Sequence, residues 1–170
     1  MKRTFALLLA LTLLLTACAN KTTAPTSKQA AEVDGNTLRI GRYHALIPAP
    51  LEVFASDDCS VSLGTDQYTI ELWALDVSGK TEDEIAHQLE SLKPLVDDAV
   101  EMETIFADQY PVGYLWTGLD ENWEFTSTIQ ATFSDSSYIY KITTILSDDA
   151  VSVSDPWTFL AAFELDSTAP

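Results

Sequence analysis

The feature that most constrains the fold is a run of strict two-residue alternation, WEFTSTIQATF at 123–133. Its odd positions are apolar except Ser127, and its even positions are all polar. Successive side chains of a β-strand point to opposite faces, so this pattern predicts a strand with one face on a core and one toward water. Strands of this kind are typical of antiparallel sheets. The run therefore favours an antiparallel sheet as the framework of the domain.

Weaker alternation predicts further strands before and after this run. We place them at 43–47, 59–63, 68–74, 110–119 and 138–145. The turn sequence GTDQ separates the second of these from the third, and SDSS separates the run at 123–133 from the last. Short polar turns between alternating segments indicate β-hairpins. We therefore expect two hairpins, joined by longer connections.

Two helices are also predicted. Thr81 precedes the first helix, and Glu84 three residues later completes a capping box. The apolar stripe of this helix consists of Ile85, Leu89, Leu92 and Val96. The second helix opens at SDP, at 154–156, and is apolar on most sides up to Leu165. A helix that is apolar nearly all round is expected to be buried, so we expect this one deep against the sheet.

This order of elements predicts an α+β layered fold, with an antiparallel meander sheet, a central helix and a buried C-terminal helix. The segments YHALIPAP, YPVGYLWTG and PWTFLAAFEL occupy the start, middle and end of this arrangement. Between Tyr43 and Leu165 the pattern resembles the PsbP-like fold. That family includes many small bacterial lipoproteins. The resemblance implies an assembly or binding protein without a shared catalytic site, and it assigns no functional residue.

The N-terminus predicts export and lipidation. A short positive start is followed by an apolar run at 5–15, which as a helix would span about 16 Å against roughly 30 Å of hydrocarbon. It is too short for a stable membrane anchor and fits a signal peptide. The order Leu15, Thr16, Ala17, Cys18 resembles the bacterial lipobox. This resemblance implies cleavage before Cys18 and attachment of a diacylglycerol to its thiol.

The chain is thus expected to have four parts. Residues 1–17 form the cleaved signal peptide, residues 18–35 the lipidated cysteine with a disordered tether, residues 36–165 one α+β domain, and residues 166–170 a tail. The tether is small and polar, and a flexible chain of its length reaches roughly 23 Å. We expect the domain on the extracytoplasmic face of a bacterial membrane, either the cell membrane or the outer membrane.

The charge of the chain excludes one class of partner. The net charge is −17, and after residue 35 the chain carries 5 basic against 24 acidic residues. A field of this sign repels nucleic acid, so we expect no nucleic-acid binding. It would attract cations or basic partners, although an acidic surface also serves solubility alone. The oligomeric state is left open.

No motif predicts catalysis, and we expect no cofactor, no metal site and no enzymatic activity. His44 and His87 lack partners at metal-ligand spacing, and Cys59 alternates with Val61 and Leu63 as a buried apolar residue would. The acidic clusters lack the glycine-containing loop pattern of calcium sites. A small hydrolase with paired carboxylates stays an alternative, because the separation of carboxylates in space is not visible in a sequence.

One surface is predicted to bind a partner. Trp73 falls on the opposite side of its strand from Ile70 and Leu72, among polar neighbours. Its sheet face is expected to carry Thr126, Thr128 and Thr132 as well. An exposed aromatic residue on a polar face is typical of interfaces. The sequence thus favours a noncatalytic, membrane-anchored envelope lipoprotein that binds or assembles with a protein. A solute- or ion-binding module of a transporter or sensor is the alternative.

Overall fold

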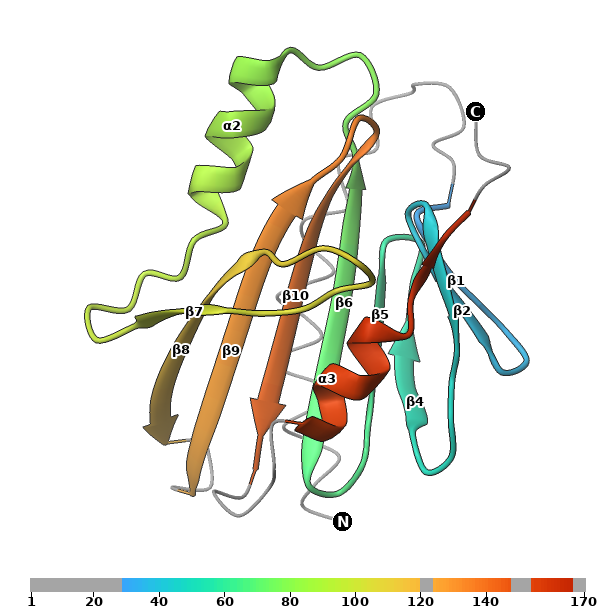
Figure 1. The fold of residues 1–170 in the computed structure, drawn as a ribbon, viewed down its shortest axis with the longest axis vertical. Helices are drawn as coiled ribbons and strands as arrows, with labels where there is room; N and C mark the ends of the chain where they lie inside the picture. The colour runs from blue at the N-terminus through green and yellow to red at the C-terminus, as the bar shows by residue number, and fades with distance from the viewer. Residues whose placement is uncertain (1–28, 120–123, 148–153, 167–170) are drawn as a thin grey trace.

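Two antiparallel sheets form the domain (Figure 1). The computed structural model describes residues 29–119, 124–147 and 154–166. The large sheet has the spatial order β4 (Glu52–Ser56), β5 (Ser60–Gly64), β6 (Tyr68–Asp76), β10 (Tyr138–Leu146), β9 (Phe125–Ser134), β8 (Val112–Leu119) and β7 (Val100–Glu103). The small sheet has the order β1 (Ala31–Asp34), β2 (Thr37–Ile40), β3 (Tyr43–Leu46) and β11 (Glu164–Leu165). The helices described are α2 (Glu82–Ser91) and α3 (Ser154–Ala161).

The antiparallel framework is confirmed, but the α+β layered class with a central helix is wrong. The fold is mainly β, because α2 and α3 are short and neither forms a layer of its own. The α2 helix has no buried residue. A helix contributes a layer only when it buries an apolar face against its neighbours, and the stripe of α2 is too weakly apolar for that.

Both predicted hairpins are present, with turns built by local hydrogen bonds. The β5–β6 turn is closed by the Thr65 N–H, which donates to the Tyr68 carbonyl at 2.9 Å. In the β9–β10 turn the Asp135 carboxylate accepts from the N–H groups of Ser137 and Tyr138, at 2.7 and 2.8 Å. An aspartate that binds the backbone two residues ahead stabilises a turn locally. This locality is why the sequence pattern located both turns.

The core lies between the two sheets and centres on Phe106, which is fully buried. Its ring centroid lies 5.0 Å from that of Tyr43 and 4.7 Å from that of Phe163. Tyr140 of β10 joins the same cluster, and its hydroxyl donates to Asp135 at 2.9 Å. Phe106 belongs to the connection between β7 and β8, so the connection fills the space between the sheets.

The two helices lie on opposite faces of the large sheet. Leu160 and Trp157 of α3 contact the apolar face, next to Ile129 and Ala131. On the other face the Gln130 amide of β9 donates to the Leu92 carbonyl at the end of α2, at 2.6 Å. The even positions of the 123–133 run were predicted to face water, and Gln130 contradicts this, because the chain following α2 covers it.

The prediction of a buried C-terminal helix is confirmed in part, because one side of the helix packs against the sheet and the other is exposed. In α3, Pro156, Phe159 and Leu160 are buried, whereas Thr158 and Ala161 are exposed. The helix ends early, and the next two residues after Phe163 form β11 against β3. Splitting the apolar segment between a helix and a strand explains why its residues do not follow one helical face.

The domain begins before the predicted boundary. Residues Ala31–Asp34, placed in the tether, form β1 and pair with β2, and Ala31 is fully buried. At the other end Asp166, assigned to the tail, donates its N–H to the Arg42 carbonyl at 2.7 Å. The signal peptide, the lipobox residues and Cys18 lie outside the described residues. Within the described ranges no helix is long and apolar enough to cross a bilayer.

Candidate functional site

The strand register places the predicted partner-surface residues on one face of the large sheet. Lys141 of β10 pairs with Trp73 on one side and with Thr132 on the other. Thr128 pairs with Ile145 two rows further along the same face, and Thr126 lies two residues before Thr128 on β9. Residues paired across antiparallel strands point the same way. We call this face, opposite α3, the polar sheet face.

The polar sheet face carries more aromatic residues than the sequence predicted. Tyr114 and Trp116 of β8 pair with Gln130 and Thr128. Both aromatic side chains are half-buried. Their strand alternates weakly, so its pattern did not reveal which side faces the core. The face therefore combines two tryptophans and a tyrosine with a row of threonines.

A small depression lies beside Trp73 on this face. It has a volume of about 50 Å³ and is lined by Trp73, Glu71, Lys141 and serines of β5. Burial raises the pKa of the Glu71 carboxyl, and the positive charge of Lys141 opposes this rise. The depression holds little more than a water molecule. It adds shape to the face but is too small to be a ligand site by itself.

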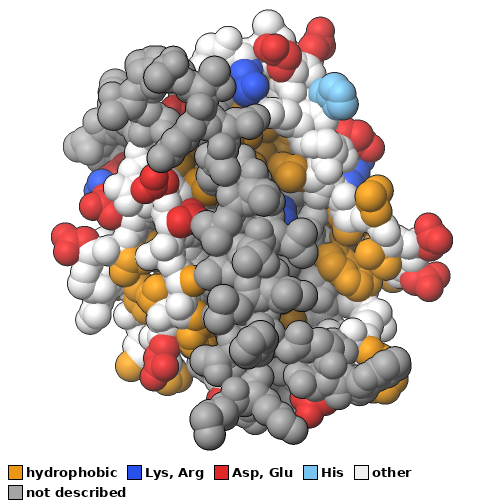
Figure 2. Space-filling view, turned by 180° about the vertical axis from the view of Figure 1, so that it is seen from behind, with side chains coloured by type: hydrophobic (Ala, Val, Ile, Leu, Met, Phe, Trp, Pro, Cys, Tyr) orange, Lys and Arg blue, Asp and Glu red, His pale blue; other side chains and the backbone are white. Residues whose placement is uncertain are grey.

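The surface around the polar sheet face is acidic. Figure 2 shows the molecule from behind, with Asp and Glu side chains spread around the rim and few Lys or Arg side chains between them. Of the basic groups, Arg39 pairs with Asp166 at 3.2 Å and Lys93 with Glu90 at 2.8 Å. The resulting potential favours a partner that carries positive charge.

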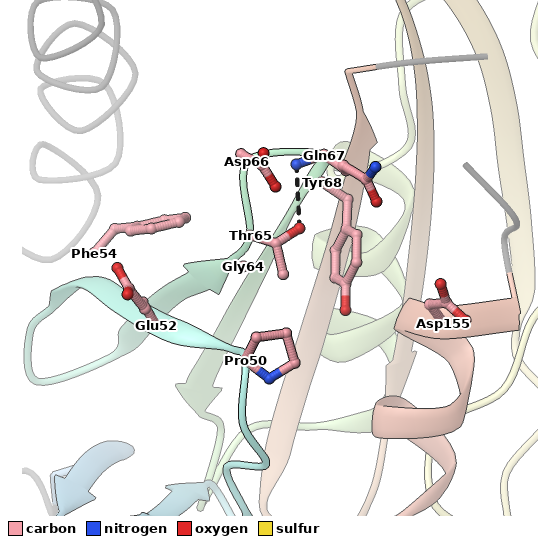
Figure 3. A pocket seen from close by; sticks show the side chains of 9 residues that line it. All are labelled: Pro50, Glu52, Phe54, Gly64, Thr65, Asp66, Gln67, Tyr68 and Asp155. Atoms are coloured by element: carbon pink, nitrogen blue, oxygen red, sulfur yellow. Dashed lines mark hydrogen bonds between the residues drawn. The ribbon is translucent and has the colours of Figure 1, made fainter. Parts of the chain in front are cut away.

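A larger cavity lies at one end of the sheets, and we call it the end pocket (Figure 3). Its volume is about 640 Å³. The pocket is formed where the start of β4, the β5–β6 turn and the first turn of α3 meet. The residues that line it are Pro50, Glu52, Phe54, Gly64, Thr65, Asp66, Gln67, Tyr68 and Asp155. Sequence analysis missed this site, because its residues come from three separate segments.

Tyr68 is the most buried ionisable side chain of the end pocket, with 7% of its surface exposed. In Figure 3 its ring extends from β6 toward the space between Pro50 and Asp155. Burial, and then the negative charge of Asp155, raises the pKa of the phenol above its usual range. The raised pKa keeps the Tyr68 hydroxyl protonated and neutral.

Three carboxylates line the end pocket, and none of the basic residues of the domain does. The turn that carries Asp66 is held by the Gln67 N–H, which donates to the Thr65 hydroxyl at 3.1 Å. The described parts of the chain contain no group of three or more acidic, histidine or cysteine side chains close enough to hold a metal ion. The carboxylates of the pocket are therefore spread around the cavity and are not gathered in one place, as the ligands of a metal ion would be.

The histidines lie away from the end pocket. His87 is exposed on α2. His44 of β3 lies near Asp166, with its Nδ1 3.7 Å from the carboxylate. Cys59 is buried, as its alternation with Val61 predicts, but it is disulfide-bonded and not a free thiol. Among the described residues that line the pocket, no nucleophilic side chain is paired with a general base.

Comparisons with known proteins identify the fold and nothing more specific. No protein-family model matches the chain, and no curated protein matches it in sequence. A solved structure from Bacteroides thetaiotaomicron VPI-5482 is similar, with a TM-score of 0.56 and 8% sequence identity. The match covers 82% of this chain and 49% of that one, so this chain spans about half its length. The PsbP-like resemblance stays a prediction.

Proposed function

We propose that this chain is a noncatalytic envelope lipoprotein of bacteria, anchored through Cys18, whose acidic domain binds a partner protein through the polar sheet face. The anchor rests on the N-terminal sequence, and each buried methylene of an acyl chain contributes about 0.8 kcal/mol to membrane attachment. One chain alone attaches only marginally. Two or three chains, as the lipobox implies, would keep the domain at the membrane.

The observation that carries the binding function is the row formed by Trp73, Lys141 and Thr132 on adjacent strands. The opposite face of the same strands is apolar and covered by α3 and the small sheet. Because this row lies on the face opposite the core, its aromatic, cationic and hydroxyl side chains do not contribute to core packing. Tryptophan and tyrosine are enriched in protein interfaces and among the residues that contribute most of the binding energy.

Lipid labelling tests the anchor. The chain is expressed in a bacterium that processes lipoproteins and is fed a labelled fatty acid. Cys18→Ser is expected to lose both the label and the membrane fractionation, whereas Cys59→Ser, which changes the other cysteine of the chain, retains both. Label retained by Cys18→Ser, or an intact mass that still includes the leader, would refute the anchor.

Capture from envelope extracts tests the binding face. Trp73→Ala combined with Thr128→Glu is expected to remove a partner that the unchanged chain captures. Thr117→Glu is the matched control, because Thr117 is exposed on β8 and points to the opposite face of the sheet. If the double variant folds and captures the same proteins as the control, the polar sheet face is not the binding surface.

The end pocket favours a second function, that of a solute-binding module serving a transporter or sensor. Its volume falls within the range of about 300–1,000 Å³ that is typical of small-molecule sites. Aromatic and acidic side chains line it together. This function is compatible with the same anchor, because a lipid tether would place the pocket next to a membrane transporter.

A further inference from the structure

We propose that the outer edge of β7 binds an extended segment of a partner protein by strand addition, and that basic and apolar residues alternate in this segment. β7 is the last strand of the large sheet, and among the described strands it pairs with β8 alone. This inference goes beyond the proposed function, because it uses the edge of the sheet instead of the polar sheet face. It does not depend on Trp73.

The hydrogen bonds between β7 and β8 show which backbone groups face the outer edge. In continuation of the β7–β8 register, the Thr104 N–H donates to the Pro111 carbonyl at 3.1 Å, so these two residues form a hydrogen-bonded pair. Bonded and non-bonded pairs alternate along an antiparallel ladder, so the backbone of Met102 also bonds to β8. The N–H and C=O groups of Glu101 and Glu103 therefore point away from β8, toward the outer edge.

The other edges of the two sheets are less open to a new strand. The pairing of β4 with β5 is irregular between Val53 and Ala55, and a bulge of this kind turns an edge away from further pairing. β1 is bonded at its start to the carbonyl of Asp58, and β11 has 2 residues. β7 contains neither a proline nor a register shift. Of the edge strands that the structure describes, β7 is the one best suited to accept another strand.

The charge along this edge favours a basic segment. Glu101 and Glu103 are exposed, and exposed aspartates precede them at 97 and 98. From residue 94 to residue 119 the chain has no Lys, Arg or His. Lys93, just before this stretch, is paired with an acid of α2 at 2.8 Å. Opposite charges that face each other on adjacent strands are stabilising, so we expect Lys or Arg of the partner opposite the two glutamates.

The other side of the same edge favours apolar residues between the basic ones. Side chains alternate between the faces of a strand, so Val100 and Met102 point to the face opposite Glu101 and Glu103. Val100 is 63% exposed and Met102 is half-buried. Apolar side chains of an added strand would remove both from water. Backbone hydrogen bonds would supply the affinity, and the alternation of side chains would supply the specificity.

A second copy of this chain fits the edge poorly. Two β7 strands placed side by side would bring their glutamates together, and like charges directly opposite each other are destabilising. Each copy also carries a net charge of −17, so the copies repel each other at long range. Natural sheets protect their edges from self-pairing with charged side chains of this kind. Glu101 and Glu103 therefore oppose self-pairing and leave the edge open to a segment of opposite charge.

Calorimetric titration of the purified full chain in detergent tests the proposal with synthetic peptides. The probe is a short, acetylated and amidated peptide in which lysine and valine alternate. The control peptide has the same composition, with the lysines and the valines grouped in separate blocks. We expect the alternating peptide to bind with a Kd below about 1 mM, and the block peptide to bind about tenfold more weakly. Equal affinities, or no binding of the alternating peptide, would overturn the proposal.

N-methylated peptides test the backbone hydrogen bonds on the unchanged protein. In an antiparallel pair, the lysines opposite Glu101 and Glu103 belong to hydrogen-bonded pairs, so their N–H groups face β7. Methylation of the lysine N–H groups is expected to weaken binding by more than about tenfold. Methylation of the valine N–H groups, which face away from β7, is expected to change the Kd by less than about threefold. An equal loss for the two methylated peptides would overturn strand addition.

Charge reversal tests the edge from the side of the protein. Glu101→Lys combined with Glu103→Lys is expected to weaken binding of the lysine–valine peptide by more than about tenfold and to create binding of a peptide in which glutamate and valine alternate. Glu82→Gln is the matched control for a single charge, because Glu82 is exposed on α2. Its Kd is expected to stay within about twofold, against about twofold to fivefold weaker binding for Glu103→Gln. Unchanged preference in the reversed variant, or equal losses in the two single variants, would overturn the proposal.

Glu103→Pro tests the outward N–H itself. Proline is tolerated on an edge strand where its nitrogen faces away from the neighbouring strand, so we expect the variant to retain its far-UV circular dichroism spectrum. Its binding of the alternating peptide is expected to be weakened by more than about tenfold, beyond the loss in Glu103→Gln, which keeps the N–H. A folded Glu103→Pro that binds as well as Glu103→Gln would overturn the proposal. The N-methylated peptides give the same test without any change to the protein.

Two comparisons distinguish the proposed occupant from the alternatives. Trp73→Ala is expected to leave the peptide titration unchanged, and loss of binding would place the peptide on the polar sheet face and overturn the assignment to β7. Failure of the polar sheet face to capture a partner would leave the peptide result as it is, so the two proposals fail separately. Sedimentation of the unchanged chain is expected to show no dimer that depends on β7. A dimer that Glu103→Pro abolishes would make a second copy the occupant and overturn the proposal.

Discussion

Replacing Phe106 with alanine tests the account of the core. The side chain is fully buried. Its ring centroid lies 5.0 Å from that of Tyr43, 5.4 Å from that of Phe133 and 4.7 Å from that of Phe163. Truncating a buried phenylalanine costs about 3–5 kcal/mol. The aromatic pairs add about 0.5–1.5 kcal/mol each beyond buried area, so this site should not fall below the middle of that range. We expect a loss of about 4 kcal/mol in the free energy of unfolding.

Urea denaturation followed by tryptophan fluorescence measures this loss. A domain of this kind is stable by about 5–15 kcal/mol, so the variant loses a large share of its stability. With a denaturant slope of about 1.5 kcal/mol/M, the unfolding midpoint is expected to fall by about 2 to 3 M.

Phe125→Ala is the matched control, because the same truncation is made at a side chain that is 68% exposed. We expect it to change stability by less than about 0.5 kcal/mol. If Phe106→Ala lowers the midpoint no further than Phe125→Ala, the β7–β8 connection does not fill the core, and the description of the two sheets as one unit fails.

Two other predictions concern the backbone and a helix cap. Gly41 has φ +57, and a Cβ there would lie 2.5 Å from the Tyr140 hydroxyl oxygen, so Gly41→Ala is expected to cost more than about 2 kcal/mol by urea denaturation. Gly35→Ala, at φ +58 with open space around it, should cost only about 1 kcal/mol; equal losses would contradict the steric argument. Hydrogen bonds from the N–H and then the hydroxyl of Thr81 lower the pKa of Glu84. Because the pKa is lower in the folded state, the cap's stabilisation is present above the unfolded pKa and is lost as pH falls through the folded value. The protection of α2 amides, that is, their exchange rate relative to the intrinsic rate at the same pH, should fall over that acidic window, and Thr81→Ala should abolish this pH dependence; an unchanged profile in the variant would refute it.

Local signals were sufficient for part of the fold. The β9 strand follows from its alternation, and the β5–β6 and β9–β10 hairpins follow from their turns, because a turn is stabilised by residues within it. The Thr81–Glu84 capping box was likewise predicted and is present. Each of these features depends on residues only a few positions apart, so neighbouring sequence is enough to specify it.

The fold class and the short strands could not be predicted from local sequence in the same way. The strands β1, β4, β7 and β11 have at most five residues, and their pairing partners determine them more than their own composition does. The stripe of α2 predicted a packed helix, but helical periodicity does not show whether a partner surface exists. The chain offers α2 only the edge of a face already filled by polar side chains, and so α2 stays exposed.

The sequence by itself determined the signals that act in order along the chain: the positive start, the apolar run, the lipobox pattern ending at Cys18, the acidic surplus, and the alternation that requires an antiparallel sheet. Only the tertiary structure decided which face of that sheet is polar, where Phe106 packs, and that Tyr68 meets Asp155 in one pocket. The physical reason is distance along the chain. Tyr68 and Asp155 belong to different elements, and their approach depends on the pairing of β6 with β10 and on the docking of α3, neither of which a local pattern encodes.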